Sequence, residues 1–216
     1  MSNVLVLAAH PDDETLGCGA TIAKLASEGH RITLLTFTDG VSARGNNEAP
    51  NRNEKLKLCA EILGIHSYKT GTFPDNRMDS IPLIQVCKFI EDSVDFIPDI
   101  IFTHHHSCLN IDHQIVARAT NVAFRPPHGG QIKIYAYYVP SSTDYEFSST
   151  FDGHSYFNVE DYKEIKLKCL RMCYNEEMRD FPHSRSYENV ENLMRVWGAE
   201  AGIEYAEKFK LLKEVI

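Results

Sequence analysis

Apolar and polar positions alternate along the chain in two ways, and each predicts a different kind of element. Short apolar runs with the length of buried strands predict strands over residues 3–9, 31–38, 67–70, 99–103 and 133–138. Apolar positions at helical spacing predict helices over residues 15–28, 54–63, 84–96, 114–124, 160–174 and 188–198. Because strand and helix alternate at the lengths of βαβ crossovers, we expect an α/β fold with a mostly parallel sheet and helices on both faces.

The connecting segments complete this prediction. The polar stretch over residues 43–53 and the segment 73–79 are expected to be loops, and residues 141–156 a polar and aromatic loop beside the substrate. A sixth strand is expected near the C-terminus. No internal repeat or linker interrupts the pattern, so residues 1–216 are predicted to form a single domain.

Composition and charge narrow the class of protein. Of the 216 residues, 43% are hydrophobic and 24% are charged, which is typical of a globular protein. The formal net charge of -8 argues against a nucleic-acid-binding surface. No apolar run approaches the roughly 20 residues of a membrane span, and the first strand begins too early for a signal peptide. The six cysteines include no C-x-x-C pair, so we expect a cytoplasmic protein with reduced, mostly buried thiols.

One histidine and three carboxylates follow the first predicted strand. The segment is Ala9-His10-Pro11-Asp12-Asp13-Glu14, and it lies where the strand gives way to a helix. Open α/β sheets bind ligands at the carboxyl ends of their strands, and crowded carboxylates repel one another unless a cation neutralises them. The acids preferred at a helix N-terminus would explain one of these residues but not three. We therefore interpret the segment as half of a metal site.

A second polar cluster follows the fourth predicted strand, over residues 104–113, and so lies on the same edge of the sheet as the first. A catalytic zinc typically takes three protein ligands and keeps one position for water. His10, Asp13 and His113 supply that number. The spacing does not decide which of Asp12 and Asp13 binds the ion and which acts as a base.

The other polar residues of the second cluster have less direct roles. Asn110 and Asp112 are candidates to accept the second N–H of a metal-bound histidine, while the alternative for Asp112 is a helix N-cap. Adjacent strand residues face opposite ways, so at most one or two of His104, His105 and His106 can point to the site.

These motifs resemble the signature of the PIG-L/LmbE-like N-deacetylases, zinc enzymes that remove acetyl groups from N-acetylglucosamine-type amino sugars. The segment Ala9-His10-Pro11-Asp12-Asp13-Glu14 is similar to the family's first motif, and Asn110-Ile111-Asp112-His113 is similar to its second. Further similarities extend over most of the chain, at Arg52-x-Glu54, Ser141-Ser142-Thr143, His183-x-Arg185-Ser186 and Glu204-Tyr205-Ala206-Glu207-Lys208-Phe209.

The resemblance implies a fold, a ligand set and a mechanism. The implied fold is a Rossmann-like three-layer α/β sandwich, with His10, Asp13 and His113 as ligands of one Zn²⁺ and Asp12 as the general base. Zinc lowers the pKa of its bound water from about 15.7 to about 7, and that water attacks the acetyl carbonyl. A site of two histidines and one aspartate would also accept Fe²⁺ or Co²⁺.

The second motif departs from that of some members in one position. They carry His-Pro-Asp-His there, and the first histidine helps to polarise the carbonyl, whereas this chain has Asn110. The candidates to stabilise the oxyanion are therefore Asn110, His105, His183 and a tyrosine.

Charged residues outside the two motifs are candidates for contacts with the substrate. Arg52 and Asp79 are expected to contact the sugar or a phosphate, and His183 and Arg185 to close over it from the C-terminal segment. The implied substrate is an N-acetylated amino sugar that is free, nucleotide-linked or glycosidic. The sequence leaves the oligomeric state open, and a homo-oligomer is one option.

Two other functions stay open on the sequence. His10, a carboxylate and His113 also match the facial triad of a non-haem Fe(II) oxygenase, although such enzymes commonly have all-β jelly-roll folds. The other is a non-catalytic nucleotide- or sugar-binding module. Against it, Gly17-x-Gly19 lacks the spacing of a dinucleotide fingerprint, and such a module has no need of so many acids.

Overall fold

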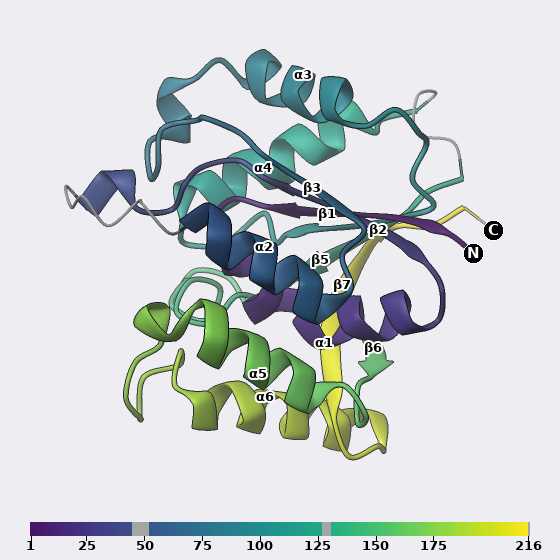
Figure 1. Cartoon of the computed structure of the whole chain (residues 1–216), viewed down its shortest axis with the longest axis vertical. Coiled ribbons are helices and arrows are strands. Elements are labelled where there is room, and N and C mark those ends of the chain that lie inside the picture. The colour runs from purple at the N-terminus through teal and green to yellow at the C-terminus, as the bar shows by residue number, and fades with distance from the viewer. Residues whose placement is uncertain (45–51, 127–130, 216) are drawn as a thin grey trace.

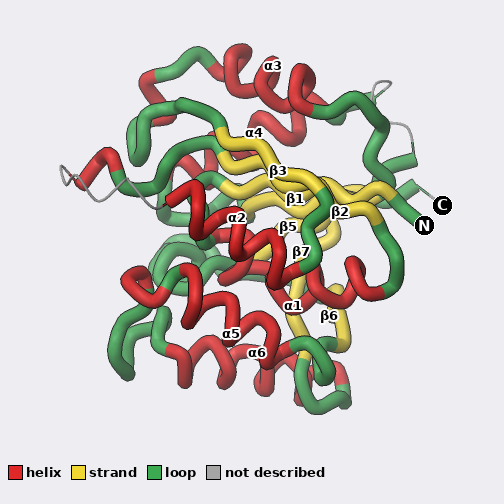
Figure 2. The backbone as a smooth tube through the Cα atoms, viewed as in Figure 1, coloured by secondary structure: helices red, strands yellow, loops and turns green. Residues whose placement is uncertain are grey.

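The computed structural model describes residues 1–44, 52–126 and 131–215. Its strands are β1 (Asn3–Ala8), β2 (Arg31–Thr36), β3 (Ser67–Thr70), β4 (Ile100–His104), β5 (Lys133–Tyr137), β6 (Ser155–Asn158) and β7 (Ala206–Lys213). Its α-helices are α1 (Asp13–Ser27), α2 (Arg52–Leu63), α3 (Leu83–Ser93), α4 (Ile111–Ala123), α5 (Lys163–Cys173) and α6 (Tyr187–Ala201). The sheet lies between helices on either side (Figures 1 and 2).

The described strands form one sheet in the order β3-β2-β1-β4-β5-β7-β6. Neighbouring strands from β3 to β5 are parallel, and β7 pairs antiparallel with both β5 and β6. The predicted α/β fold with a mostly parallel sheet is confirmed, and the predicted C-terminal strand is β7. The loop predicted over residues 141–156 was wrong at its end, because Ser155 and Tyr156 belong to β6 and pair with Phe209 and Lys208 of β7.

Helices cover both faces of the sheet, as the sequence predicted. Helices α1 and α2 cover one face, with α5 packed on both of them and α6 packed against β6 and β7 (Figure 1). Helices α3 and α4 cover the opposite face. Successive residues of β1 enter different cores, Val4 and Val6 on the α1 side and Leu5 and Leu7 on the α4 side, because strand side chains alternate.

The strand order brings two distant chain segments together. Strand β1 lies between β2 and β4 in the sheet. The sheet therefore grows from β1 in both directions, through β2 and β3 on one side and through β4 and β5 on the other. From the carboxyl ends of β1 and β4 the chain leads into α1 and α4, which lie on opposite faces. A crevice forms at such a switch point, and open α/β sheets bind their ligands there. Both polar motifs of the sequence lie at this crevice.

Both polar motifs contribute the first turns of helices. The sequence predicted helix starts at residues 15 and 114, whereas α1 begins at Asp13 and α4 at Ile111. The partial positive charge of a helix N-terminus stabilises acidic side chains, so each helix can begin at polar residues that precede its first periodic apolar position. The predicted loop over residues 43–53 lies mostly outside the described residues. The one predicted over residues 73–79 ends in the 3₁₀ turn Met78–Ser80.

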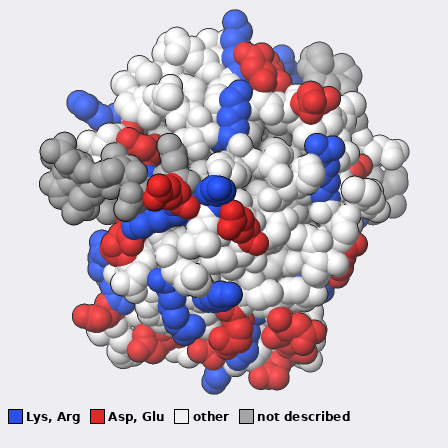
Figure 3. Space-filling model, in the orientation of Figure 1, with Lys and Arg blue, Asp and Glu red and all other residues white. Residues whose placement is uncertain are grey.

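The surface shown in Figure 3 carries acidic and basic side chains interspersed on one face. Among the residues that the structure describes, no helix is long and apolar enough to cross a membrane.

Candidate metal centre

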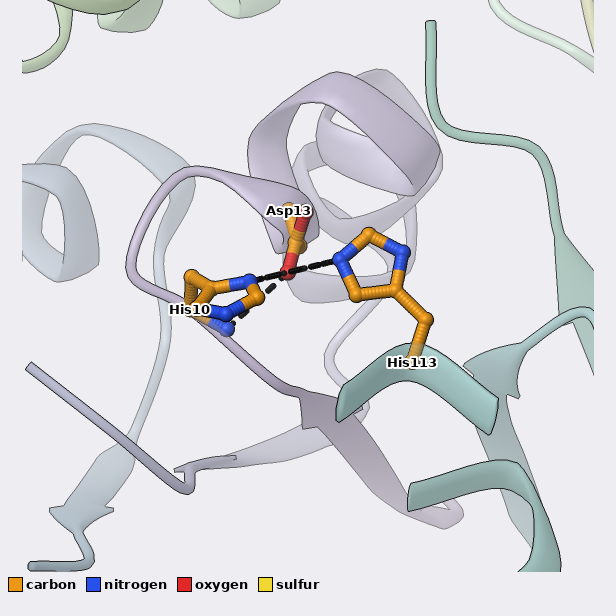
Figure 4. Close-up of side chains that lie close together, drawn as sticks. All are labelled: His10, Asp13 and His113. Carbon is orange, nitrogen blue, oxygen red and sulfur yellow. Dashed lines mark hydrogen bonds and ion pairs between the residues drawn. The ribbon is translucent and has the colours of Figure 1, made fainter. Parts of the chain in front are cut away.

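Three side chains from the two motifs converge on one point (Figure 4). Asp13 Oδ2 lies 3.1 Å from His10 Nδ1 and 3.1 Å from His113 Nε2, and the two nitrogens are 3.3 Å apart. Ligands of a tetrahedral zinc ion with bonds of about 2.0–2.1 Å lie about 3.3–3.4 Å from one another. The three donors are buried and have the chemistry and the spacing of a site for a divalent ion. The structure thus brings together the three residues that the sequence selected.

The turn that carries two of these ligands is held by its own side chains. Asp13 Oδ2 accepts a hydrogen bond from the His10 N–H at 2.9 Å, and the Asp13 N–H donates to the His10 carbonyl at 3.3 Å. Between them, Asp12 has a φ of 138°, a conformation that strains residues other than glycine by about 1–3 kcal/mol. The Asp12 N–H donates to Glu14 Oε2 at 3.0 Å.

The second ring nitrogen of His10 faces two carboxylates. His10 Nε2 lies 3.1 Å from Asp112 Oδ2 and 3.3 Å from Asp75 Oδ1. A proton on Nε2 bonds to these acids and leaves the Nδ1 lone pair free for an ion, which is how metal-bound histidines are usually oriented. These three atoms are also close enough to share an ion. However, both Asp112 oxygens already accept backbone N–H groups, from Asn76 and Met78, so we assign this group to orienting His10.

The N-terminus of α4 separates the roles of two residues that the sequence left open. The Asn110 side chain is the N-cap and accepts from the Asp112 N–H at 2.8 Å. The alternative in which Asp112 is the cap is therefore wrong. Since Asn110 satisfies the helix end, the Asp112 carboxylate is free to reach His10.

His113 is supported from behind by two further side chains. Its Nδ1 lies 3.1 Å from Cys108 Sγ, on the side of the ring away from Asp13. The His104 ring stacks on His113 with the ring centroids 3.9 Å apart, and His104 Nε2 accepts from the Ala9 N–H at 2.8 Å. Of the three consecutive histidines, His104 is therefore the one that packs against the ligands.

The charges of the site favour a bound cation. Burial alone would raise the pKa of Asp13, but His113, His104 and His10 outweigh burial and hold that pKa well below its usual range. Burial alone would lower the pKa of His113, yet Asp13 and Cys108 raise it to about 9. The centre thus stabilises positive charge on His10 and His113, and a divalent ion would supply that charge without a proton on the donor nitrogens.

Asp12 lies beside the three donors without joining them. It is 3% exposed, and its Oδ2 pairs with Arg185 Nη1 at 3.2 Å. Burial raises the pKa of Asp12 to about 7, and the Arg185 charge opposes this rise. The Arg185 Nε also donates to the Pro140 carbonyl at 3.3 Å, which holds the guanidinium over the site.

A small polar pocket opens onto these groups. Its volume is about 130 Å³, and its lining is His10, Asp12, Gly40, Arg52, Asp75, Asn76, Asn110, His113 and Arg185. Arg52 is buried, with Nη2 bonded to Glu177 at 2.8 Å, while its Nη1 has no hydrogen-bond partner among the described residues. This orphaned donor suits an oxygen atom of a bound molecule.

Three residues that the sequence placed at the substrate do not line this pocket. Asp79 is exposed in the Met78–Ser80 turn. His105 faces away from the ligands, bonds Ser107 Oγ at 2.8 Å and lines a separate cavity of about 420 Å³. His183 packs on Tyr145, and its Nδ1 accepts from the Arg185 N–H. His183 therefore stabilises the segment that carries Arg185.

Sequence reasoning missed two residues of the site. Asp75, and not Asp79, is the acid of its loop that lines the pocket, where it lies 3.3 Å from His10 Nε2, and no signal in the sequence distinguishes these two acids. Glu177, the buried partner of Arg52, lies far away in sequence and carries no motif. By contrast, strand alternation already separates His104 from His105, which must face opposite ways.

The chain is similar in sequence or in fold to proteins of known name. The uncharacterized deacetylase YaiS of Escherichia coli (strain K12) is 32% identical over 178 residues, which are 78% of this chain and 88% of YaiS. The diacetylchitobiose deacetylase of Thermococcus kodakarensis is 34% identical over 84 residues, 36% of this chain and 32% of that protein. Among solved structures, GalB of Pseudomonas putida, a 4-carboxy-2-hydroxymuconate hydratase, has a TM-score of 0.78 at 18% identity and covers 100% of this chain and 98% of its own.

The similarity to GalB shows a common fold and no more, because its sequence identity is low and one fold hosts many activities. The family model described as GlcNAc-PI de-N-acetylase matches residues 5–124, more than half of the chain and the part that carries all three metal-donor residues. This match and the relationship to YaiS lead to the same result: the chain belongs to the PIG-L family.

Proposed function

We propose that this protein is a metal-dependent hydrolase that removes the acetyl group from an N-acetylated amino sugar. The observation that carries the proposal is the position of Asp12, whose carboxylate shares one small pocket with His10 and His113 of the three-donor centre. The two deacetylase relatives support the same reaction. The six buried free cysteines support a reducing, cytoplasmic setting.

The donor set favours zinc as the resident ion. His10 Nδ1, Asp13 Oδ2 and His113 Nε2 would hold it, and Fe²⁺ and Co²⁺ fit the same chemistry. When bound, such an ion makes a water nucleophilic near neutral pH and polarises the acetyl carbonyl. Asp112 keeps His10 in the tautomer that binds through Nδ1.

Asp12 moves the proton in this scheme. Its carboxylate takes a proton from the attacking water, and the carboxylic acid returns that proton to the leaving amine when the C–N bond breaks. The products are acetate and the free amino sugar, so one water is consumed and no other reactant is needed. The Arg185 guanidinium favours the ionised form of Asp12 before the reaction.

The rest of the pocket fits a sugar. Arg52 Nη1 has no hydrogen-bond partner among the described residues, with Glu176 Oε1 3.8 Å away, and Asp75, Asn76 and Asn110 present further donors and acceptors to hydroxyl groups. Asn110 and Arg185 also place N–H groups at the pocket, where they can stabilise the oxyanion. A volume of about 130 Å³ holds the acetamido group and part of one ring, so a nucleotide or glycosidic extension would lie outside.

The test is acetate release from N-acetylglucosamine, its nucleotide conjugate and N,N'-diacetylchitobiose. We expect zinc-loaded protein to release acetate from at least one of them, chelator-treated protein to be inactive, and added Zn²⁺ to restore the rate. The Asp12→Asn variant should keep its zinc and lose about 10²- to 10⁴-fold in kcat. Full activity in metal-free protein would refute the proposal.

The same assay separates the competing functions. Oxygen consumption that depends on iron and 2-oxoglutarate, without acetate release, would favour an oxygenase. Tight nucleotide or sugar binding without a bound metal would favour a binding module.

A further inference from the structure

Glu14 is the member of the first motif that the proposed reaction leaves without a role. It is fully buried, and its Oε2 accepts the Asp12 N–H at 3.0 Å. Its Oε1 accepts from Thr15 Oγ1 at 2.8 Å and from Cys59 Sγ at 3.3 Å. The donors of these hydrogen bonds are uncharged, and among the described residues no cationic side chain forms an ion pair with this carboxylate. Burying a charge in this way is costly, which calls for a specific use.

The main-chain group that Glu14 bonds belongs to the residue with the strained backbone. Asp12 has φ 138° and ψ -29°, and its carbonyl accepts from the N–H groups of Thr15 and Leu16 at the start of α1. The carbonyl is therefore held by the helix, while Glu14 holds the N–H. A backbone in a disfavoured conformation persists only when its surroundings fix it, and these two anchors hold the N–H and the carbonyl of Asp12.

We infer that Glu14 is a positioning residue for Asp12: it fixes the strained main chain so that the Asp12 carboxylate, and not its neighbour's, faces the pocket. The carboxylate of the next residue, Asp13, lies against the ring nitrogens of His10 and His113. With the peptide of Asp12 free to relax towards ordinary φ, its carboxylate would swing away from the reacting water. The inference rests on the proposed role of Asp12 in proton transfer.

Two conservative variants of Glu14 separate the effect of side-chain length from the effect of negative charge. Glu14→Gln keeps the length of the side chain, so its amide oxygen still accepts the Asp12 N–H, and its amide nitrogen can donate to Thr15 Oγ1. Glu14→Asp keeps the charge but is one methylene too short. Positioning predicts that Glu14→Gln keeps most of the wild-type kcat, while Glu14→Asp loses about 10²-fold in kcat with KM unchanged, as expected for a displaced catalytic group. A role for the negative charge predicts the reverse order.

A matched control is provided by a β7 residue that bonds the same helix, α1. Glu207 is another fully buried carboxylate that accepts backbone N–H groups of α1, those of Ala20 and Thr21, and none of these residues lines the pocket. Glu207→Gln should lower the melting temperature and leave the kcat of folded, zinc-loaded protein unchanged. The Asp12 amide proton resonance should move upfield in Glu14→Asp, relative to wild type, and stay in place in Glu207→Gln.

A double-mutant cycle then tests whether Glu14 acts through Asp12. In the Asp12→Asn background, Glu14→Asp should cause no further loss of kcat, because there is no carboxylate left to position. Equal losses in both backgrounds, loss of zinc from Glu14→Asp, or wild-type kcat in Glu14→Asp would overturn the inference. If Asp12→Asn itself keeps the wild-type rate, the proposed role of Asp12 in proton transfer is wrong. If Asp12→Asn is inactive while Glu14→Asp is fully active, only the inferred role of Glu14 is wrong.

Discussion

His10 shows how much of this centre depends on single atoms. Its Nδ1 faces Asp13 and His113, while its Nε2 faces Asp112, which is itself clamped by the N–H groups of Asn76 and Met78. The Asp112 carboxylate therefore connects the loop before α3 to the N-terminus of α4 and fixes the ring between them. A ring held this way presents its lone pair to an ion at little entropic cost.

Replacing Asp112 should weaken metal binding while the ligands stay in place. We expect Asp112→Asn to lower the affinity for Zn²⁺ by about 10- to 100-fold, since one amide nitrogen must then face His10 or a backbone N–H. Competition with a zinc-sensitive dye measures this change. Asp79→Asn is the matched control, because it removes the same charge from an exposed site nearby and should leave the affinity unchanged.

Residue types and strand ends predicted which three side chains meet at the candidate metal centre, but not every neighbour of that centre. His10, Asp13 and His113 could be selected because few other reasons put such side chains at two strand ends. Asp75 could not be preferred over Asp79, since the choice depends on how the loop turns after β3. Glu177 could not be predicted from the sequence, because its role depends only on its ion pair with the distant Arg52 side chain.

At the scale of elements, α1 is divided by a kink at Cys18, where φ is -145° and ψ is 22°. The kink frees backbone groups that a straight helix would bond. Lys166 Nζ donates to the Leu16 carbonyl at 2.8 Å, and Glu207 accepts from the N–H groups beyond the kink. The two side chains also pair with each other at 2.7 Å, so α5 and β7 together hold the helix that carries the first motif.

Breaking this buried pair should destabilise the protein. We expect Lys166→Met to lower the free energy of unfolding by about 3–5 kcal/mol, because it leaves the Glu207 charge buried without its partner. Urea unfolding measures the change. Lys168→Met, an exposed position of the same helix, should change the free energy by no more than about 0.5 kcal/mol. Equal effects of the two substitutions would contradict the assigned role of the pair.

Periodicity predicted most elements and failed for short or irregular ones. Strand β6 has four residues and no fully buried side chain, so its pairing with β7 decides its structure. The kink in α1 lies within a continuous helical pattern. Gly17, next to the kink, is explained by packing and not by a dinucleotide site, because a Cβ there would lie 2.3 Å from the Tyr137 ring.

For the whole molecule, an ion held by the three donors would join the two sides of the crevice at the switch point. His10 and Asp13 follow β1 on the side of α1, whereas His113 belongs to α4 on the opposite face of the sheet. The alternation of strands and helices made this architecture predictable. The substrate is not predictable to the same degree, because the hydratase GalB has a similar fold although its activity is a different one.

An ion that joins both sides should stabilise the entire fold. Zn²⁺ at about 100 times its Kd stabilises a protein by about 2.7 kcal/mol, which corresponds to a rise of about 5–10 °C in Tm for a chain of this size. Differential scanning calorimetry of chelator-treated and zinc-loaded protein measures the shift. We expect His113→Ala to lose most of this rise, and an equal rise in that variant would place the stabilising ion elsewhere.

The most direct test of the central claim is anomalous diffraction at the zinc edge from crystals of the zinc-loaded protein. We expect one peak per chain at about 2.0–2.2 Å from His10 Nδ1, Asp13 Oδ2 and His113 Nε2, with the Asp12 carboxylate beside the open position of the ion. A peak bound instead by His10 Nε2, Asp75 and Asp112, or fully active crystals without a peak at the three donors, would contradict the account.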